Sequence, residues 1–409
     1  MSHRAGLEIA DVFRQHGEAY RVTHGATLLP EQRRVMRAIE ECRTAALGGH
    51  VSECDSCGHQ VIAYNSCRNR HCPKCQSLSG AQWVAAQQAD LLPVDYFHVV
   101  FTVPEELAPL ALQNKRVVYD ILFAAASQTL LQIAADPQHM GAEIGLLAVL
   151  HTWGQNLMHH PHLHCVVPGG GLSPDGKQWL SCRTGFFLPV RVLSRLFRRL
   201  FLQNLQRAFE RGELCFHASL AHLAQPRAFA DLVGRARRKE WVVYAKPPFG
   251  GPSQVLSYLG RYTHRVAISN DRLVKMEDGQ VTFRWKNYRR GNQQGTMTLA
   301  AAEFIRRFLL HVLPTGFQRI RRYGLLANRG RSSKLAVCRR LLGVAEDAVQ
   351  PKAPREGYQA EYETVTGESI VRCPVCRTGQ MQRVEMIAAV RVVGAWGSVP
   401  PRPSRLDTS

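Results

Sequence analysis

The sequence has no run of about 18 or more apolar residues, the length that a membrane-spanning helix needs. Its first six residues contain no apolar segment of the signal-peptide type. We therefore expect a cytoplasmic protein with no membrane partner. The sequence also lacks internal repeats, long low-complexity blocks and a Gly-x-x-x-x-Gly-Lys-Ser/Thr phosphate-binding loop, so a helicase domain is not indicated.

Acidic residues are scarce. The chain has 32 Asp and Glu against 52 Lys and Arg, a formal net charge of +20 and a pI near 9.8. Such an excess suits a polyanionic ligand, although a soluble basic protein without one would have the same composition. From Arg306 to Arg340 there are many basic residues and no acidic one, so we expect that the run is not neutralised locally. A second basic zone covers residues 191–211 and 235–239.

Cysteine is plentiful for a cytoplasmic chain. Twelve cysteines in a reducing compartment favour metal binding over disulfides. Cys54-x2-Cys57 and Cys72-x2-Cys75, separated by fourteen residues, form two knuckles that predict one tetrahedral structural zinc site. A final pair, Cys373-x2-Cys376, resembles half of a zinc ribbon whose partners would come from elsewhere in the chain or from another subunit.

A second zinc site is a weaker interpretation of the same region. Its ligands would be Cys42, His50, Cys67 and His71, with His59 as a spare candidate. The alternative is that these side chains bind no metal, because buried cysteines and solvated histidines are stable without one.

The pattern of elements predicts an α+β fold, an antiparallel sheet with helices packed on it. Residues 96–103, 144–152, 162–167 and 241–245 are typical of strands, and residues 107–134 and 193–211 of helices. Residues 272–276 and 281–285 predict a hairpin. We expect a helical lead and zinc-binding domain in residues 1–90, a core in residues 91–300, and a basic helical C-terminal region with a disordered tail in residues 301–409.

Two short motifs suggest chemistry when they are taken together. His162-Leu-His164 on a strand puts both imidazoles on one face, where they can hold a divalent ion. Tyr258 and Tyr262 lie four residues apart and share one face of a predicted helix that begins near Ser253. Separately, each motif is common as an ordinary packing feature. Together they are the parts of a metal-dependent tyrosine nuclease.

The divalent ion needs a third ligand. His151, on the preceding predicted strand, is our first candidate and Gln155 the second, while His159 and His160 lie in the same cluster. Sparse imidazole ligands with open positions for phosphate oxygens suit Mg²⁺ or Mn²⁺ acting as a Lewis acid. A tyrosine hydroxyl has a pKa near 10 and needs activation, which the ion and neighbours such as Arg261, His264 and Arg265 could supply.

Basic and aromatic residues alternate from Arg284 to Arg290, a pattern that suits single-stranded nucleic acid because cations contact phosphates while rings stack on bases. The candidate DNA-binding residues are Arg261, Arg265, Arg284, Trp285, Lys286, Arg289 and Arg290. The expected partner is single-stranded or hairpin DNA, and the sequence is compatible with an oligomer.

The histidine pair, the segment Tyr258 to Asn270 and the cysteine-rich segment Ser66 to Gln76 resemble the two-tyrosine rolling-circle transposases of bacterial insertion sequences, the insertion sequence 91 family. The resemblance spans about residues 30–340. It implies an HUH (histidine–hydrophobic–histidine) endonuclease core on a small antiparallel sheet and an N-terminal zinc-binding domain. It also implies cleavage of single-stranded transposon ends, with one tyrosine forming a 5′-phosphotyrosine link and the other serving the second cleavage or the strand transfer.

Other functions fit parts of the pattern. A relaxase or plasmid replication initiator uses the same core chemistry. A tyrosine recombinase fits less well, because it uses one tyrosine and no metal. A zinc-dependent DNA-binding regulator would carry the charge and the cysteines without any catalysis, and it would form no covalent adduct with DNA.

Overall fold

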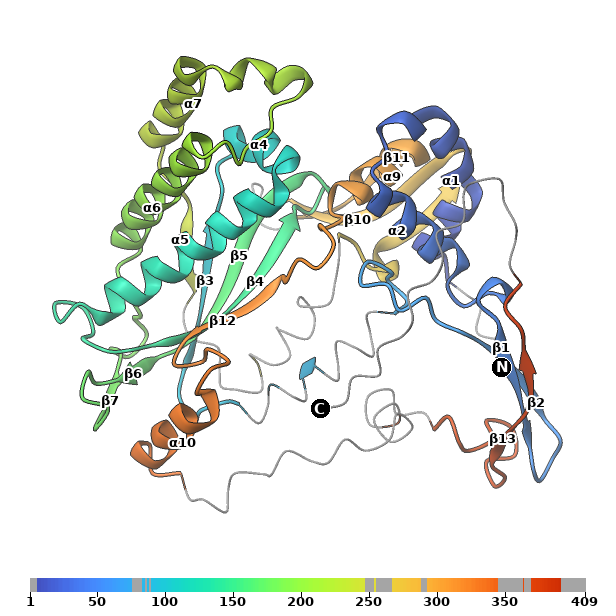
Figure 1. The fold of residues 1–409 in the computed structure, drawn as a ribbon. Coiled ribbons are helices and arrows are strands. Elements are labelled where there is room, and N and C mark those ends of the chain that lie inside the picture. The colour runs from blue at the N-terminus through green and yellow to red at the C-terminus, as the bar shows by residue number, and fades with distance from the viewer. Residues whose placement is uncertain are drawn as a thin grey trace. The chain divides into compact units, whose positions relative to one another are not determined.

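The computed structural model of the chain describes residues 6–75, 90–246, 267–287, 293–344 and 369–390, and also residues 83, 84, 87, 254 and 363. These residues fall into two compact units, which Figure 1 draws. Described residues within 1–40 and 68–369 form the large unit, and described residues within 41–67 and 370–409 form the small unit. This division differs from the expected order of three consecutive domains, because the C-terminal region contributes strands to both units.

An antiparallel sheet of five strands forms the centre of the large unit, in the order β12-β4-β5-β3-β8. Four of its strands confirm the strand predictions, and β12 was not expected because its sequence is strongly basic. The strands are β3 (Tyr96–Thr102), β4 (Gly145–Trp153), β5 (His159–Pro168), β8 (Val243–Lys246) and β12 (Ile320–Gly324).

The central strand β5 begins earlier than predicted and includes Pro161. The ladder between β4 and β5 shifts between His151 and Trp153, next to this proline. A proline cannot donate to a sheet, so a strand tolerates one where the pairing is irregular. Its carbonyl still accepts a hydrogen bond from the backbone nitrogen of Val103 at 3.1 Å. Beyond the irregularity, His162 lies opposite His151 in register.

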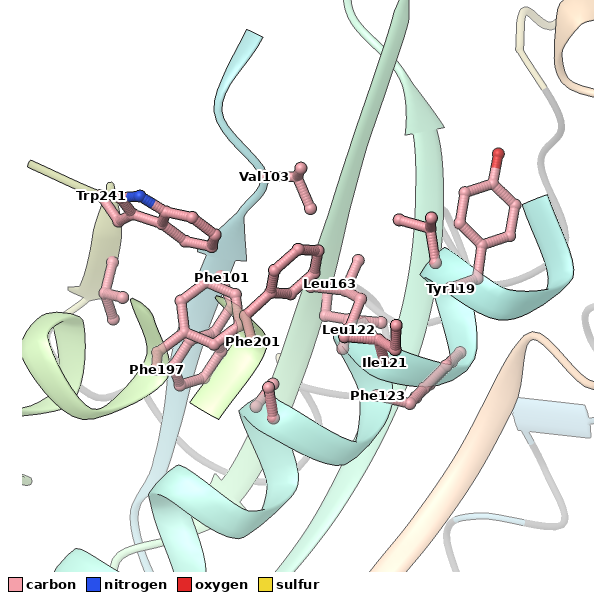
Figure 2. Close-up of a cluster of buried hydrophobic side chains, with 14 of the residues drawn as sticks. Phe101, Val103, Tyr119, Ile121, Leu122, Phe123, Leu163, Phe197, Phe201 and Trp241 are labelled. Carbon is pink, nitrogen blue, oxygen red and sulfur yellow. The ribbon is translucent and has the colours of Figure 1, made fainter. Parts of the chain in front are cut away.

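Two long helices, α5 (Lys115–Ala135) and α6 (Val190–Glu210), pack against one face of this sheet (Figure 1). Figure 2 shows Phe101 and Leu163 from the strands among side chains of both helices. The rings of Phe101 and Phe197 have centroids 4.9 Å apart, and Phe197 contacts Trp241 at 5.3 Å. Truncating one such fully buried ring to alanine costs roughly 3–5 kcal/mol in other proteins, so this core stabilises the sheet that bears the site.

Helix α5 is the one helix in the described ranges that is long and apolar enough to cross a membrane by length and composition. Its side chains are nevertheless part of the core against the sheet. Two of its buried polar residues are satisfied within the helix, since Ser127 and Thr129 donate to the carbonyls of Phe123 and Ala125 at 2.8 and 2.7 Å. We interpret α5 as the central core helix of the large unit.

A second antiparallel sheet of the large unit has the order β11-β10-β9 and confirms the predicted hairpin, with one further strand. It packs on α9 through Phe283 and Phe304, and α9 packs on α1 through Phe308 and Phe13, with ring centroids 5.8 and 5.3 Å apart. The elements are α1 (Ile9–His24), α2 (Pro30–Glu41), β9 (Leu273–Glu277), β10 (Gln280–Asn287), β11 (Gln293–Ala300) and α9 (Ala301–Leu310).

The small unit is a three-stranded antiparallel sheet in the order β13-β1-β2. Its strands come from opposite ends of the chain: β1 (Gly49–Cys54), β2 (Gln60–Tyr64) and β13 (Met381–Ile387). Most side chains of β2 and β13 are exposed. A sheet this small needs another source of stability than apolar burial.

The remaining regular elements connect these parts of the fold. They are α4 (Ala108–Gln113), β6 (Gly170–Leu172), β7 (Trp179–Ser181), α7 (Pro226–Arg238), α10 (Arg331–Leu341) and the short 3-10 turns at Gly25–Thr27, Ala45–Leu47, Glu105–Leu107, Ala218–Ala224 and Asn270–Arg272. The helix predicted for residues 107–134 is divided into α4 and α5. Asn114 lies between them, and its side chain forms hydrogen bonds with the backbone of Cys215.

The buried His311, 1% exposed, makes the stability of the large unit depend on pH. Its Nε2 lies 3.0 Å from the carbonyl oxygen of Leu157 and its Nδ1 lies 3.1 Å from the Thr152 hydroxyl. Because a carbonyl only accepts, Nε2 carries the proton and Nδ1 accepts from Thr152. Burial lowers the pKa of His311 to about 3, and the positive charges of nearby His159 and Lys115 act in the same direction.

As the pH falls below about 6.5, the unfolded chain binds a proton at His311 that the folded chain does not bind. The free energy of unfolding should therefore fall between about pH 6.5 and the folded pKa. The His311→Gln protein lacks this contribution. Its free energy of unfolding should therefore change less steeply with pH, by up to about 1.4 kcal/mol per pH unit. Urea unfolding followed by tryptophan fluorescence at several pH values measures it. The exposed His139→Gln should keep the wild-type slope, and a His311→Gln slope equal to wild type would contradict the assignment.

Candidate functional site

Three histidines meet on the face of the five-stranded sheet opposite α5 and α6. His162 and His164 lie on β5, and His151 lies on β4 opposite His162. One ring nitrogen of each lies within 4.8 Å of those of the other two. The ring centroids of His151 and His164 are 4.2 Å apart, and those of His162 and His164 are 4.9 Å apart. Three imidazoles at these distances can share one metal ion.

Strand alternation explains why the histidines share this face. Leu163 and Cys165 of β5 point into the core beneath α5 and α6, so their even-numbered neighbours point the other way. On β4 the same alternation places Leu150 in the core and His151 on the opposite face. The apolar side chains therefore pack the strands against α5 and α6, while the histidines face away from the helices.

A backbone contact orients His162. Its Nδ1 lies 2.7 Å from the carbonyl oxygen of His160. A carbonyl can only accept a hydrogen bond, so Nδ1 carries the proton and Nε2 keeps a free electron pair. This is the arrangement that metal-binding histidines commonly show.

His98 holds His164 in a similar way. His98 lies on β3, is 2% exposed, and its Nε2 is 2.7 Å from Nδ1 of His164 with the two rings nearly parallel. If Nδ1 of His164 donates to His98, Nε2 of His164 carries the electron pair that an ion would need. His98 was not among the site residues predicted from the sequence. Strand alternation could have identified it, because His98 lies two residues from Tyr96 and two from Val100 and so shares their face of β3, the face that bears the histidines.

The electrostatic setting favours uncharged rings. Burial lowers the pKa of His162 to about 4 and that of His98 to about 3, and it holds the pKa of His164 well below the usual value. The positive charge of Lys246, opposite His98 in register on β8, lowers the pKa of His98 and of His164 further. These pKa values leave His98, His162 and His164 uncharged at neutral pH, and neutral imidazole is the form that binds metal ions.

The other candidate ligands lie in different surroundings. Gln155 is in the turn after β4, and its carbonyl oxygen accepts a hydrogen bond from Arg272 at 2.7 Å. The Nε2 of His159 bonds the Tyr119 hydroxyl of α5 at 2.8 Å, on the helix side of the sheet. His160 contributes its carbonyl to His162.

The predicted nucleophiles, Tyr258 and Tyr262, lie outside the described residues, as do four of the candidate DNA-binding arginines: Arg261, Arg265, Arg289 and Arg290. Of the remaining candidates, Arg284 and Lys286 are exposed on β10, and Trp285 between them is half-buried. Their alternation puts the two cations on one face of β10 and the ring on the other.

The basic run from Arg306 to Arg340 is more neutralised than expected. Arg306 and Arg307 pair with Glu303 on α9, just before the run, and three further basic residues pair with carboxylates that are distant in sequence. The distant pairs are Arg321 with Asp120, Arg331 with Asp90, and Lys334 with Glu143. The run is therefore neutralised in part, and mainly by distant residues, because the fold of the large unit brings acidic residues from a helix and loops to it.

Four thiols form a compact cluster in the small unit, and they are not the predicted set of Cys54, Cys57, Cys72 and Cys75. Cys54 and Cys57 gather instead with Cys373 and Cys376, with the four sulfur atoms within 4.8 Å of one another. The prediction was wrong because β13 pairs with β1, which brings the C-terminal knuckle to the first N-terminal one. Sequence spacing carries no sign of that pairing.

The second predicted set, Cys42, His50, Cys67 and His71, is not formed either. The Nε2 of His71 accepts a hydrogen bond from the backbone nitrogen of Leu313 at 3.1 Å, and its Nδ1 lies 3.2 Å from Asn69. Burial lowers the pKa of His71 to about 3. The other four cysteines of the two predicted sets form two close pairs, each within 4.8 Å, Cys42 with Cys67 in the small unit and Cys72 with Cys75 in the large unit.

Comparison with known families gives two matches. Residues 12–103 match a family described as "Transposase zinc-binding domain", and residues 145–334 match one described as "Putative transposase". The second range contains His151, His162 and His164. The first range contains six of the cysteines, including Cys54 and Cys57, but neither Cys373 nor Cys376.

Two curated relatives cover most of the chain. A Sinorhizobium fredii protein named "Putative transposase y4qJ" is 62% identical over 388 residues, which is 95% of this chain and 97% of the relative. The "Transposase for insertion sequence element IS801" of Pseudomonas savastanoi pv. phaseolicola is 29% identical over 320 residues, 76% of this chain and 73% of the relative. No solved structure matches the chain.

Proposed function

We propose a mechanism for this chain, which belongs to the insertion sequence 91 family of transposases. The proposed reaction is the cleavage and rejoining of single-stranded DNA at transposon ends, with a divalent ion and a covalent 5′-phosphotyrosine intermediate. The observation that carries the proposal is the cluster of His151, His162 and His164 on one face of the sheet.

The three histidines would hold Mg²⁺ or Mn²⁺. Three neutral nitrogen ligands leave coordination positions for phosphate oxygens, which the ion can polarise. The tautomer of His162 supports this role, because its Nδ1 donates to the carbonyl of His160 at 2.7 Å and its Nε2 carries the electron pair that an ion needs. The thiolates of the small unit would bind zinc instead, because thiolates prefer softer metals than Mg²⁺.

Tyr258 and Tyr262 are the proposed nucleophiles. Attack of a tyrosine oxygen on phosphorus forms a phosphotyrosine bond and breaks the phosphodiester bond to the 3′ oxygen, which leaves as a free 3′-hydroxyl after it takes up a proton. The reverse attack by a 3′-hydroxyl releases the tyrosine and rejoins the strand. One ester replaces another at each step, so the exchange needs no ATP.

The charged residues near the histidines suit a DNA strand. Lys246 and Tyr244 lie on β8 opposite His98 and Val100, so their side chains share the histidine face of the sheet. Both side chains are largely exposed, and they provide a cation for a phosphate and a ring for a base next to the cluster. Arg284 and Lys286 on β10 offer further cations.

Two other functions share some of these features. A relaxase or a replication initiator would use the same histidine cluster, so the cluster alone does not separate it from a transposase. The match of residues 145–334 to a transposase family and the 62% identical relative favour the transposase. A regulator without catalysis would have no use for three histidines whose ring nitrogens converge.

His98 should act as a positioning residue for the ion. His98→Leu removes the partner of Nδ1 of His164, so Mn²⁺ affinity, measured by the electron paramagnetic resonance of free Mn²⁺ in a titration, should fall about 10–100-fold. His98→Gln keeps an acceptor and should lose less. The exposed His139→Leu is the matched control and should bind as wild type does. Wild-type affinity in His98→Leu would show that this hydrogen bond does not orient the ligand.

The tyrosine pair provides the direct test of the covalent chemistry. Tyr→Phe removes the nucleophile and keeps the ring, so Tyr258→Phe with Tyr262→Phe should form no covalent adduct while still binding single-stranded DNA. Each single variant should retain some cleavage but lose transposition. The measurement is denaturing electrophoresis of labelled single-stranded DNA after incubation with Mn²⁺.

Tyr244→Phe is a control on the same face of the sheet and should still form the adduct. Duplex DNA of the same sequence should give little adduct compared with the single strand. A covalent adduct in the double Tyr→Phe protein would place the nucleophile elsewhere and refute the two-tyrosine mechanism.

A further inference from the structure

We propose that the C-terminal knuckle Cys373–Cys376 completes one structural zinc site with Cys54 and Cys57. The zinc-binding family match ends at residue 103, so it does not include this half of the site. The inference is independent of the proposed reaction, because it concerns the small unit and uses none of the histidines.

The sulfur positions fit a tetrahedral ion. Sγ of Cys54 lies 3.6 Å from Sγ of Cys376, and Sγ of Cys57 lies 3.7 Å from Sγ of Cys373. Four thiolates at a zinc–sulfur distance of about 2.3 Å have sulfur atoms about 3.8 Å apart. A disulfide would bring two sulfur atoms to about 2.05 Å. The four sulfur atoms are therefore spaced as zinc ligands, two from each knuckle.

The two knuckles also share one backbone conformation. The nitrogen of Gly58 donates to the carbonyl of Cys54 at 3.0 Å, and the nitrogen of Arg377 donates to the carbonyl of Cys373 at 3.1 Å. The residue after the second cysteine is left-handed in both, with φ of 69° at Gly58 and 61° at Arg377. A positive φ is uncommon for arginine, so its occurrence at Arg377 indicates that the surrounding contacts hold this turn in its conformation.

Backbone N–H groups point at the sulfur atoms. The nitrogen of Ser56 donates to Sγ of Cys54 at 3.4 Å, and the nitrogen of Gly379 donates to Sγ of Cys376 at 3.3 Å. Such donors stabilise the negative charge of a thiolate, the form that binds zinc. A Cβ at Gly379 would lie 2.4 Å from Sγ of Cys54, so this position has no room for a larger residue.

The zinc would supply the stability that the small unit lacks. β13 pairs with β1 along six residue pairs, but the side chains of β13 are exposed or only partly buried. Backbone hydrogen bonds alone give a three-stranded sheet little net stability in water. A metal bound by both knuckles would fix β13 to β1, so binding and folding of this unit would be one event.

The test compares the zinc content of the full-length wild-type protein with that of four full-length variants. Cys54→Ser with Cys57→Ser, Cys373→Ser with Cys376→Ser, and the combination of all four changes should each lose the same one zinc equivalent relative to wild type. The exposed Cys215→Ser is the control and should lose none. Zinc is measured by a colorimetric chelator after denaturation, with metal analysis to exclude iron.

The combined variant decides the ligand set. If the two knuckles belong to different sites, it loses two equivalents; if Cys373→Ser with Cys376→Ser retains all its zinc, the C-terminal knuckle is no ligand. Either result overturns the proposal. Hydrogen exchange adds a structural readout: the amides of β13 should lose protection at least tenfold in the Cys373→Ser, Cys376→Ser protein, while those of α5 keep theirs. Unchanged protection of β13 would also contradict the proposal.

Discussion

The register between β4 and β5 is the constraint on which the candidate site depends. It places His151 directly opposite His162, with His164 two residues further along the same face. A shift by one residue would turn the histidines into the core and Leu163 out of it, so the packing under α5 and α6 fixes the register. The irregular pairing next to Pro161 allows the central strand to keep that register. The packing of the core and the arrangement of the three histidines are thus set by the same hydrogen-bonded ladder.

Hydrogen bonds around the histidines then set their chemistry. The carbonyl of His160 and the ring of His98 each occupy one Nδ1, and burial keeps the rings uncharged. In the proposed mechanism, an ion held this way would be fixed in place before DNA binds, so little reorganisation would be needed when a phosphate binds. The small unit would depend on its proposed metal differently, because its thiolates would stabilise the fold of that unit.

Much of the large unit could be predicted because its signals are local. Apolar runs give the strands β3, β4, β5 and β8, and the histidine spacing on β5 indicates a shared face. His98 could have been found from the alternation on β3, but a single histidine in an apolar strand is usually only packed. Strand β12 was missed because Arg321 and Arg322 suggest a surface segment, whereas Asp120 and Gln87 contact them in the fold.

The cysteine pairing could not be predicted from spacing. Cys54 and Cys57 lie much closer in sequence to Cys72 and Cys75 than to Cys373 and Cys376, so local spacing favoured the wrong partners. The true partners are set by the pairing of β13 with β1, a contact between the two ends of the chain. The same limit applies to three residues of the basic run, whose distant acidic partners are Asp90, Asp120 and Glu143. Contacts at long sequence separation decide both features.

The most direct measurement of the central claim is a crystal structure of the protein soaked in Mn²⁺ and recorded at the manganese absorption edge. The account predicts one strong anomalous peak within bonding distance, about 2.2 Å, of a ring nitrogen from each of His151, His162 and His164. The peak should be absent in a His162→Ala, His164→Ala crystal. A manganese peak at another place in the large unit, or one that His151 does not contact, would contradict it.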